Sequence, residues 1–247
     1  MNPQLLLDLE LKRDSHNDHA CLSLAHYSLY PELSQSVASF LHPRELAYFN
    51  SLGELKRKTD FLMGRYAAKL ALKRLIPGVH GSDIDIHPGV FQQPLVTGPA
   101  CQGVSVCITH SANLSAALAF PTSHPVGIDL EAIEASHLLS LQEHVETSEF
   151  PADVRSVDED IASYTRAWTI KEALSKVLRC GLMTPFSVLR LADDGAIQNK
   201  TWSGGFENFH QYRYLSLASP KFAFALVHPG RTQPIIALEQ IQAFVSG

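Results

Sequence analysis

The stretch Trp168-Thr-Ile-Lys-Glu-Ala-Leu-Ser-Lys176 lies at the centre of the segment with the clearest helical pattern in the chain. The apolar side of this segment consists of Trp168, Leu174, Val177 and Leu178. This spacing predicts a helix over about residues 161–178. Gly181 follows closely and supplies a stop signal. The remaining elements are therefore placed outward from this helix.

The same stretch carries two charged residues with chemical potential. Glu172 and Lys176 are four residues apart, so a helix places them on one face. A glutamate N-terminal to a lysine is the favourable order for an ordinary surface ion pair, which is the simpler interpretation. Trp168 lies one turn earlier, near the same face, and indicates a partly buried wall. Burial perturbs the pKa values of carboxylates and lysines, and such perturbation suits catalysis.

Two more carboxylates belong to the segment Val126-Gly-Ile-Asp-Leu-Glu131, which is predicted to be a strand. Asp129 and Glu131 are two positions apart and therefore point to the same face of that strand. Their mutual repulsion would be relieved by a hard cation such as Mg²⁺. A solvated strand edge is the simpler interpretation of these two acids by themselves.

A third polar group is Thr109-His110-Ser111, which directly follows the alternating segment Val104–Ile108. The end of a strand holds polar side chains rigidly, although a loop cap explains an isolated His-Ser pair as well. The sequence contains no Gly-x-Ser-x-Gly, Gly-x-x-x-x-Gly-Lys-Ser/Thr or Gly-x-Gly-x-x-Gly motif. A serine hydrolase of the nucleophile-elbow type, a P-loop enzyme and a dinucleotide-binding fold therefore lack support.

Composition narrows the function classes further. The 247 residues are 45% hydrophobic and 18% charged, which indicates a real core and little disorder. A net charge of −5 argues against non-specific nucleic-acid binding. No signal peptide or long apolar stretch is present, so a cytoplasmic protein without a membrane partner is expected. The four cysteines form no Cys-x-x-Cys pair and are expected to be free thiols.

Coarse patterns predict the other elements. Additional helices are expected from Pro43 onward, over 55–75, over 136–148 and over 239–245. Strands are expected over 104–108, 114–120, 126–131, 187–191, 212–217, 222–227 and 235–238. Residues 1–35 are polar and mixed and show no strong period. Lys69–Ile76 resembles Lys171–Leu178, 102 positions later, although two amphipathic helices can resemble each other by chance.

Three segments, in this order, resemble the signatures of 4′-phosphopantetheinyl transferases. These segments are Ile108-Thr-His-Ser111, Val126–Glu131 and Trp168–Lys176. The resemblance is strongest to the long, pseudo-dimeric type of surfactin and enterobactin systems. Gly64-Arg-Tyr-Ala-Ala-Lys69 is similar to the Gly-Arg-x-Ala-Ala helix of enterobactin-type members. The resemblance covers about residues 40–190.

The resemblance implies a fold of the α+β class. It implies two similar α/β halves related by pseudo-twofold symmetry, with the active site in the cleft between them. Together with the internal repeat, this places an N-terminal half at residues 1–122 and a C-terminal half at 123–247. Two halves within one chain imply a monomer.

The resemblance also implies an activity of the holo-[acyl-carrier-protein] synthase type. The 4′-phosphopantetheine group of coenzyme A would pass to a serine of an apo acyl or peptidyl carrier protein, with Mg²⁺ bound and 3′,5′-ADP released. The metal-binding carboxylates would be Asp129, Glu131 and Glu172. Glu172 would also be the general base. The residues at the coenzyme A phosphates would be Lys176, His110 and Ser111.

One departure from the family pattern concerns coenzyme A affinity. The family often has Gly-Lys-Pro or Gly-Arg-Pro before the His-Ser segment, whereas this chain has Phe91-Gln-Gln-Pro94. Gln93 can hydrogen-bond a phosphate but cannot neutralise its charge. Arg57 and Arg65, on the helix predicted over 55–75, are further candidates for nucleotide contact. A carrier contact or a solvated surface is the alternative for each arginine.

Two other functions stay open on the sequence alone. The same acids could serve another Mg²⁺-dependent enzyme, a phosphohydrolase or a nuclease. A non-catalytic relative could bind coenzyme A or a carrier without transferring anything, and Gln93 is the feature that favours this alternative. The sequence does not indicate whether a fatty-acid, polyketide or nonribosomal-peptide carrier is served.

Overall fold

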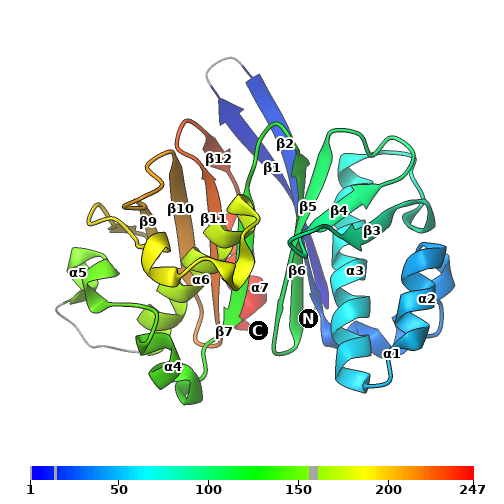
Figure 1. Cartoon of the computed structure of the whole chain (residues 1–247), viewed down its shortest axis with the longest axis horizontal. Coiled ribbons are helices and arrows are strands. Elements are labelled where there is room, and N and C mark those ends of the chain that lie inside the picture. The colour runs from blue at the N-terminus through cyan, green and yellow to red at the C-terminus, as the bar shows by residue number, and fades with distance from the viewer. Residues whose placement is uncertain (1, 14–15, 156–160) are drawn as a thin grey trace. The chain divides into compact units, whose positions relative to one another are not determined.

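The computed structural model describes residues 2–13, 16–155 and 161–247. The chain forms two compact units, which we call unit 1 and unit 2. Unit 1 comprises Met1–Pro125 with Pro234–Ile236, and unit 2 comprises Val126–Gln233 with Ala237–Gly247. Each unit combines a five-stranded sheet with a long helix (Figure 1), so the predicted α+β class is confirmed. No helix within the described residues has the length and apolarity required to cross a bilayer.

The sheet of unit 1 includes a hairpin that the sequence patterns did not predict. Its strand order is β12 (Gln233–Ile235), β1 (Gln4–Arg13), β2 (His16–His26), β6 (Leu114–Pro121) and β5 (Val104–Ser111). In β1, Leu7, Leu9 and Leu11 are buried, whereas Asp8 and Glu10 between them are exposed. This alternation is a strand signal with a period of two. The statement that residues 1–35 show no strong period was therefore wrong for β1.

A long helix covers one face of this sheet. Helix α3 (Leu55–Leu75) has the predicted bounds and packs on β6, β2 and β5. Small buried residues, among them Ala67, Ala68 and Ala71, let α3 approach the sheet closely. Helix α2 (Pro43–Ser51) begins at the predicted proline, and His42 and Glu45 form a capping box at its start.

Shorter elements complete unit 1. They are η1 (Tyr27–Leu29), α1 (Tyr30–Leu33), η2 (Val37–Ser39), η3 (Gly81–Asp83), β3 (Asp85–Pro88) and β4 (Pro94–Thr97). Strands β3 and β4 form a separate antiparallel hairpin. This hairpin lies between α3 and β5 in the chain.

Unit 2 repeats the combination of a sheet and a long helix. Its strand order is β7 (Gly127–Ala132), β11 (Phe222–Pro229), β10 (Tyr212–Ala218), β9 (Thr201–Gly205) and β8 (Ala196–Gln198). Helix α6 (Ile161–Leu178) packs on β7, β11 and β10, and α7 (Leu238–Ser246) ends the chain. The predicted bounds of α6 are confirmed. The first residue after α6 is Arg179, which has a left-handed φ of 57°. The helix therefore ends before the predicted stop at Gly181.

Two predicted elements of unit 2 were wrong. The helix expected over 136–148 is broken into η4 (Ala135–His137), α4 (Leu138–Gln142) and η5 (Thr147–Glu149), before α5 (Ala152–Arg155). The strand expected over 187–191 is replaced by η7 (Phe186–Leu189), which follows η6 (Gly181–Met183). One physical reason is shared, because Glu149 ends a capping box and also accepts the Leu191 backbone N–H at 3.0 Å. These tertiary contacts override the local pattern.

A buried lysine–glutamate pair occurs in each unit. In unit 1, Lys69 Nζ lies 2.5 Å from Glu45 Oε2, and in unit 2, Lys171 Nζ lies 2.7 Å from Glu149 Oε1. All four side chains are buried. The two lysines are the residues that the internal sequence repeat aligns.

The glutamates of the two pairs also have matching backbone contacts. Glu45 and Glu149 each close a capping box at the start of a helical segment. Glu45 then accepts the N–H of Ile86 at 3.1 Å, as Glu149 accepts that of Leu191 at 3.0 Å. Each pair thus connects a capped helical segment, a long helix and a later backbone segment of the same unit. The expected twofold relation between the halves stays a prediction.

Candidate functional site

Strand β7 and helix α6 carry the predicted acidic residues of unit 2. Asp129 and Glu131 lie on β7, and Glu172 lies on α6, which packs against β7. Gly127 makes this packing close, because a Cβ atom there would lie 2.4 Å from the Ala173 backbone oxygen. Only glycine tolerates that approach, so the two acid-bearing elements are held near each other.

The acids of these two elements are electrostatic neighbours. Asp129 is buried, and its Oδ1 lies 2.6 Å from Lys176 Nζ. Burial raises the pKa of Glu172, the charge of Asp129 raises it further, and the Lys176 charge opposes both effects. The structure thus brings together three of the predicted residues, Asp129, Glu172 and Lys176, in one cluster that we call the acid cluster.

Two of the three predicted metal ligands, Asp129 and Glu172, provide carboxylate oxygens that suit a hard cation. Carboxylate oxygens are the ligands that Mg²⁺ prefers, and a cation would relieve the repulsion between Asp129 and Glu172. Glu131 is half-buried on the same face of β7 as Asp129. Across the described ranges, however, no three His, Cys, Asp or Glu side chains gather so that they could hold one ion. The structure does not assemble a centre of three carboxylates.

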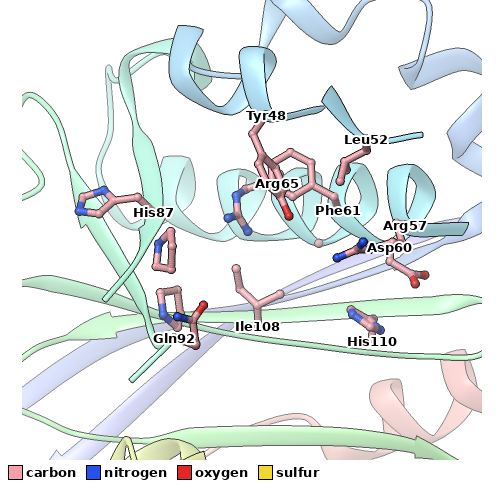
Figure 2. Close-up of a pocket in the computed structure, with 13 residues that line it drawn as sticks. Tyr48, Leu52, Arg57, Asp60, Phe61, Arg65, His87, Gln92, Ile108 and His110 are labelled. Carbon is pink, nitrogen blue, oxygen red and sulfur yellow. The ribbon is translucent and has the colours of Figure 1, made fainter. Parts of the chain in front are cut away.

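Three of the predicted nucleotide contacts of unit 1 meet in a cavity. This cavity, of about 410 Å³, contains His110 from β5 and both Arg57 and Arg65 from α3 in its lining. Figure 2 shows these three side chains along the cavity, with Tyr48 and Phe61 beside them. We call it the nucleotide cavity. His110 and Ser111 belong to β5 itself, rather than to a loop after a shorter strand.

Arg65 is held in place before any ligand binds. Its guanidinium lies 4.6 Å from the centre of the Phe61 ring, and its Nε lies 3.2 Å from Glu45 Oε1. Its Nη2 donates a hydrogen bond of 3.1 Å to the backbone oxygen of Ile86. Stacking and two polar contacts fix the plane of this arginine, which favours recognition of a planar or anionic ligand.

Two predicted contact residues lie outside the lining of the nucleotide cavity. The Gln93 side-chain oxygen accepts the Phe91 backbone N–H at 2.9 Å, within the turn between β3 and β4. Its neighbour Gln92, which has a φ of 64°, lines the cavity instead. Ser111 is half-buried and is not part of the lining, because it follows His110 on a strand and points to the other face.

Asp60 is a cavity residue that sequence reasoning missed. Its carboxylate accepts hydrogen bonds from Tyr27 Oη at 2.8 Å and from Lys56 Nζ at 2.7 Å. The only sequence signal was the four-residue spacing of Lys56 and Asp60 on a predicted helix. Its position in the cavity lining beside His110 depends on how α3 packs on β5, which no local pattern specifies.

A second cavity, of about 580 Å³, lies beside α6 in unit 2. The Trp168 and Phe186 rings in its wall are stacked, with centroids 4.4 Å apart and planes at 6°. Lys171 also lines it, one residue before Glu172. The partly buried wall predicted from Trp168 is therefore present, one turn from the acid cluster.

The part of the chain that contains the acid cluster is similar in sequence to a known family. Residues 125–227 match the family model of the 4′-phosphopantetheinyl transferase superfamily. The match covers less than half of the chain, and we call residues 125–227 the superfamily segment. The superfamily segment contains all four charged residues predicted on β7 and α6, namely Asp129, Glu131, Glu172 and Lys176. Among curated proteins, no sequence matches this chain.

Solved structures of holo-acyl-carrier-protein synthases are similar to parts of this chain. The enzyme of Bacillus anthracis, in complex with coenzyme A (3′,5′-ADP), is 18% identical and covers 47% of this chain and 97% of its own, with a TM-score of 0.38. That of Helicobacter pylori, in complex with coenzyme A, is 18% identical, with coverages of 40% and 95% and a TM-score of 0.33. That of Plasmodium yoelii is 20% identical, with coverages of 48% and 95% and a TM-score of 0.35.

Proposed function

We propose that this protein transfers the 4′-phosphopantetheine group of coenzyme A to a serine of an apo acyl or peptidyl carrier protein and releases 3′,5′-ADP. The observation that carries the proposal is the acid cluster, which lies on β7 and α6 within the superfamily segment. We further propose that the protein is of the long type with two similar halves. We expect it to act as a monomer, since the acid cluster and the nucleotide cavity belong to one chain.

The nucleotide cavity is proposed to bind the nucleotide end of coenzyme A. Arg57, Arg65 and His110 provide donors and positive charge for phosphate oxygens. The Tyr48 and Phe61 rings, with centroids 5.0 Å apart, provide an apolar surface suited to a purine. These features support binding without the basic residue that Gln93 replaces, because Arg57 and Arg65 supply the missing charge from α3.

The residues of the acid cluster have distinct proposed roles. Mg²⁺, when held by Asp129 and Glu172, would polarise the phosphoryl oxygen and neutralise charge on the leaving group, with Glu131 on the same face of β7 as the predicted further ligand. Glu172 accepts the proton of the carrier serine, and its raised pKa makes it a stronger base than an ordinary glutamate. Lys176, whose ammonium donates a hydrogen bond to Asp129 in this structure, can instead donate one to a phosphate oxygen of coenzyme A.

The test is to incubate the protein with Mg²⁺, coenzyme A and an apo carrier protein, and then to weigh the carrier. We expect a mass gain of one phosphopantetheine group and one equivalent of 3′,5′-ADP. Asp129→Ala and Glu172→Ala should each lower the rate about 10²–10³-fold, since each removes one charge-stabilising group. Glu134→Ala, which removes an exposed acid just beyond β7, is the matched control and should keep the rate.

Other outcomes distinguish the alternatives. Release of phosphate from coenzyme A without a carrier would indicate a phosphohydrolase. Binding of coenzyme A without any transfer would indicate a non-catalytic relative. Near-normal transfer by either acid variant would remove the acid cluster from the mechanism.

A further inference from the structure

The Asp60 carboxylate is fixed on both of its oxygens. Oδ1 accepts the hydroxyl hydrogen of Tyr27, which belongs to η1, and Oδ2 accepts from Lys56, one turn earlier on α3. The Asp60 side chain is only 14% exposed. A lysine–aspartate pair at this spacing is usually a solvated surface pair, but such a pair does not need a tyrosine from another element. The Tyr27 hydroxyl thus fixes the orientation of this carboxylate.

The group that Asp60 faces across the nucleotide cavity is His110. Both residues line the cavity, and Figure 2 shows them at the same end of it, with Arg57 nearby. Burial raises the pKa of Asp60, but the hydrogen bonds from Lys56 and Tyr27 and the His110 charge together lower it. The imidazole and the carboxylate are therefore electrostatic neighbours, joined from β5 and α3.

The two arginines near His110 act on its protonation in the opposite direction to Asp60. The titratable and charged groups that line the cavity with it are Tyr48 from α2, Arg57, Asp60 and Arg65 from α3, and His87 from β3. Two guanidinium groups disfavour a proton on a neighbouring imidazole. Asp60 is the one carboxylate among the described residues that line this cavity. Without it, no carboxylate would line the cavity together with His110 and the two arginines.

We propose that Asp60 is a positioning residue that keeps His110 protonated for phosphate binding, and that Tyr27 holds Asp60 in place. This inference rests on the proposed function, in which coenzyme A phosphates enter the nucleotide cavity. A protonated ring donates from both nitrogens and carries a positive charge, whereas a neutral ring loses one donor and the charge. Coenzyme A affinity therefore falls as the pH rises through the His110 pKa.

The decisive experiment measures the His110 pKa directly, in the ligand-free full chain. The imidazole signals are followed by NMR against pH, and His110 is assigned by its absence from a His110→Gln spectrum. Asp60→Asn should lower the His110 pKa by about one unit, because an opposite charge beside the ring is lost. Asp83→Asn removes the same charge at an exposed site of unit 1 and should leave it unchanged. Equal His110 pKa values in these two variants would overturn the proposal.

A second variant keeps the test independent of any folding defect. Tyr27→Phe retains the ring and the Asp60 charge but removes the hydrogen bond that orients the carboxylate. It should lower the His110 pKa in the same direction by a smaller amount, and Asp60→Glu should restore most of the wild-type value. If Tyr27→Phe leaves the His110 pKa at the wild-type value, the role assigned to Tyr27 is wrong.

Binding measurements connect the positioning role to the ligand. The Kd of coenzyme A, measured by calorimetry, should rise about tenfold in Asp60→Asn at neutral pH, the equivalent of one pKa unit. It should approach the wild-type value at acidic pH, where the ring is protonated in both proteins. In transfer assays, KM should rise with little change in kcat. A protein that binds no coenzyme A would refute the proposed function, whereas the His110 titration would still decide the role of Asp60.

Discussion

Glu172 combines a proposed catalytic role with a cost to the folded state. Its pKa is raised by burial and by the neighbouring charge of Asp129, with Lys176 opposing both. A carboxyl group whose pKa is higher in the folded than in the unfolded state binds its proton more tightly when folded. Ionisation therefore destabilises the fold, and this cost is present above the folded pKa and absent below the ordinary value of 4.5.

Replacing this carboxylate should therefore separate stability from activity. In the presence of EDTA, Glu172→Gln should have a higher free energy of unfolding than the wild type near pH 8. That gain should vanish as the pH falls below 4.5, where both side chains are neutral. Transfer should fall about 10²–10³-fold. Urea unfolding at several pH values measures the first effect, and carrier mass measures the second.

Glu134→Gln is the control for this experiment, because Glu134 is exposed. It should change the free energy of unfolding by no more than about 0.5 kcal/mol at any pH. A Glu172→Gln protein that is less stable than the wild type near pH 8 would show that Glu172 is stabilised, rather than strained, by its surroundings.

The residues of the site differ in how far the sequence could predict them. The spacing of Asp129 and of Glu172 within their own segments made them candidates, and the resemblance of these segments to the family signatures assigned them to a metal site. Asp60 gave no such signal, because its neighbour His110 lies 50 positions away on another element. Gln93 resembled a ligand contact by its place in the family motif, yet its side chain closes a turn. Side-chain direction in a turn depends on backbone angles that a motif does not contain.

At the scale of elements, the distance between β7 and α6 depends on Gly127. A Cβ atom at this position would approach the Ala173 backbone oxygen to 2.4 Å and Val177 Cγ2 to 2.7 Å. The backbone oxygen cannot rotate away as a flexible side chain can. Any larger residue must therefore push α6, with Glu172, away from the strand that carries Asp129.

Gly127→Ala should accordingly affect both stability and metal dependence. We expect a loss of about 1–3 kcal/mol in the free energy of unfolding, the usual cost of overpacking. We also expect the Mg²⁺ concentration for half-maximal transfer to rise, because the distance between Asp129 and Glu172 increases. Gly53→Ala is the control, since a Cβ atom there would meet nothing within 4 Å. Equal Mg²⁺ dependence in both variants would contradict this account.

The elements that the sequence predicted well are those whose own pattern is strong. The bounds of α3 and α6 were predicted closely because each is a long helix with a regular apolar side. The helix expected over 136–148 failed because Glu149 is drawn into a buried pair with Lys171, a partner 22 positions away. The β1–β2 hairpin was missed although Leu7, Leu9 and Leu11 alternate with polar residues. Correct prediction of residues 136–148 would have required tertiary information, whereas the alternation in β1 was visible in the sequence and was overlooked.

At the scale of the whole molecule, each unit has its own buried ion pair. Lys69 and Glu45 stabilise unit 1, and Lys171 and Glu149 stabilise unit 2. Removing one partner of such a pair leaves an uncompensated buried charge, which typically costs about 3–5 kcal/mol. The hydrogen bonds described for each lysine go to residues of the same unit. The loss of stability should therefore stay within that unit.

Lys69→Met should therefore loosen unit 1 more than unit 2. Hydrogen exchange measured by mass spectrometry should accelerate in α3, β2 and β6, with a smaller change in α6 and β11. Lys73→Met, at an exposed position of the same helix, is the control and should leave exchange unchanged. Equal acceleration in both units would show that they unfold as one cooperative body.

The pairing of β12 (Gln233–Ile235) with the sheet of unit 1 has a practical consequence for engineering. Cutting the polypeptide near Thr122 would not separate an independent amino-terminal piece, since the carboxy-terminal piece still supplies β12 beside β1. A shortened gene that stops before Gln233 would strip β1 of that neighbour and leave its backbone groups open to other chains, a known route to aggregation. Purification tags and truncations at the far end of the sequence therefore have to be judged by their effect on the beginning.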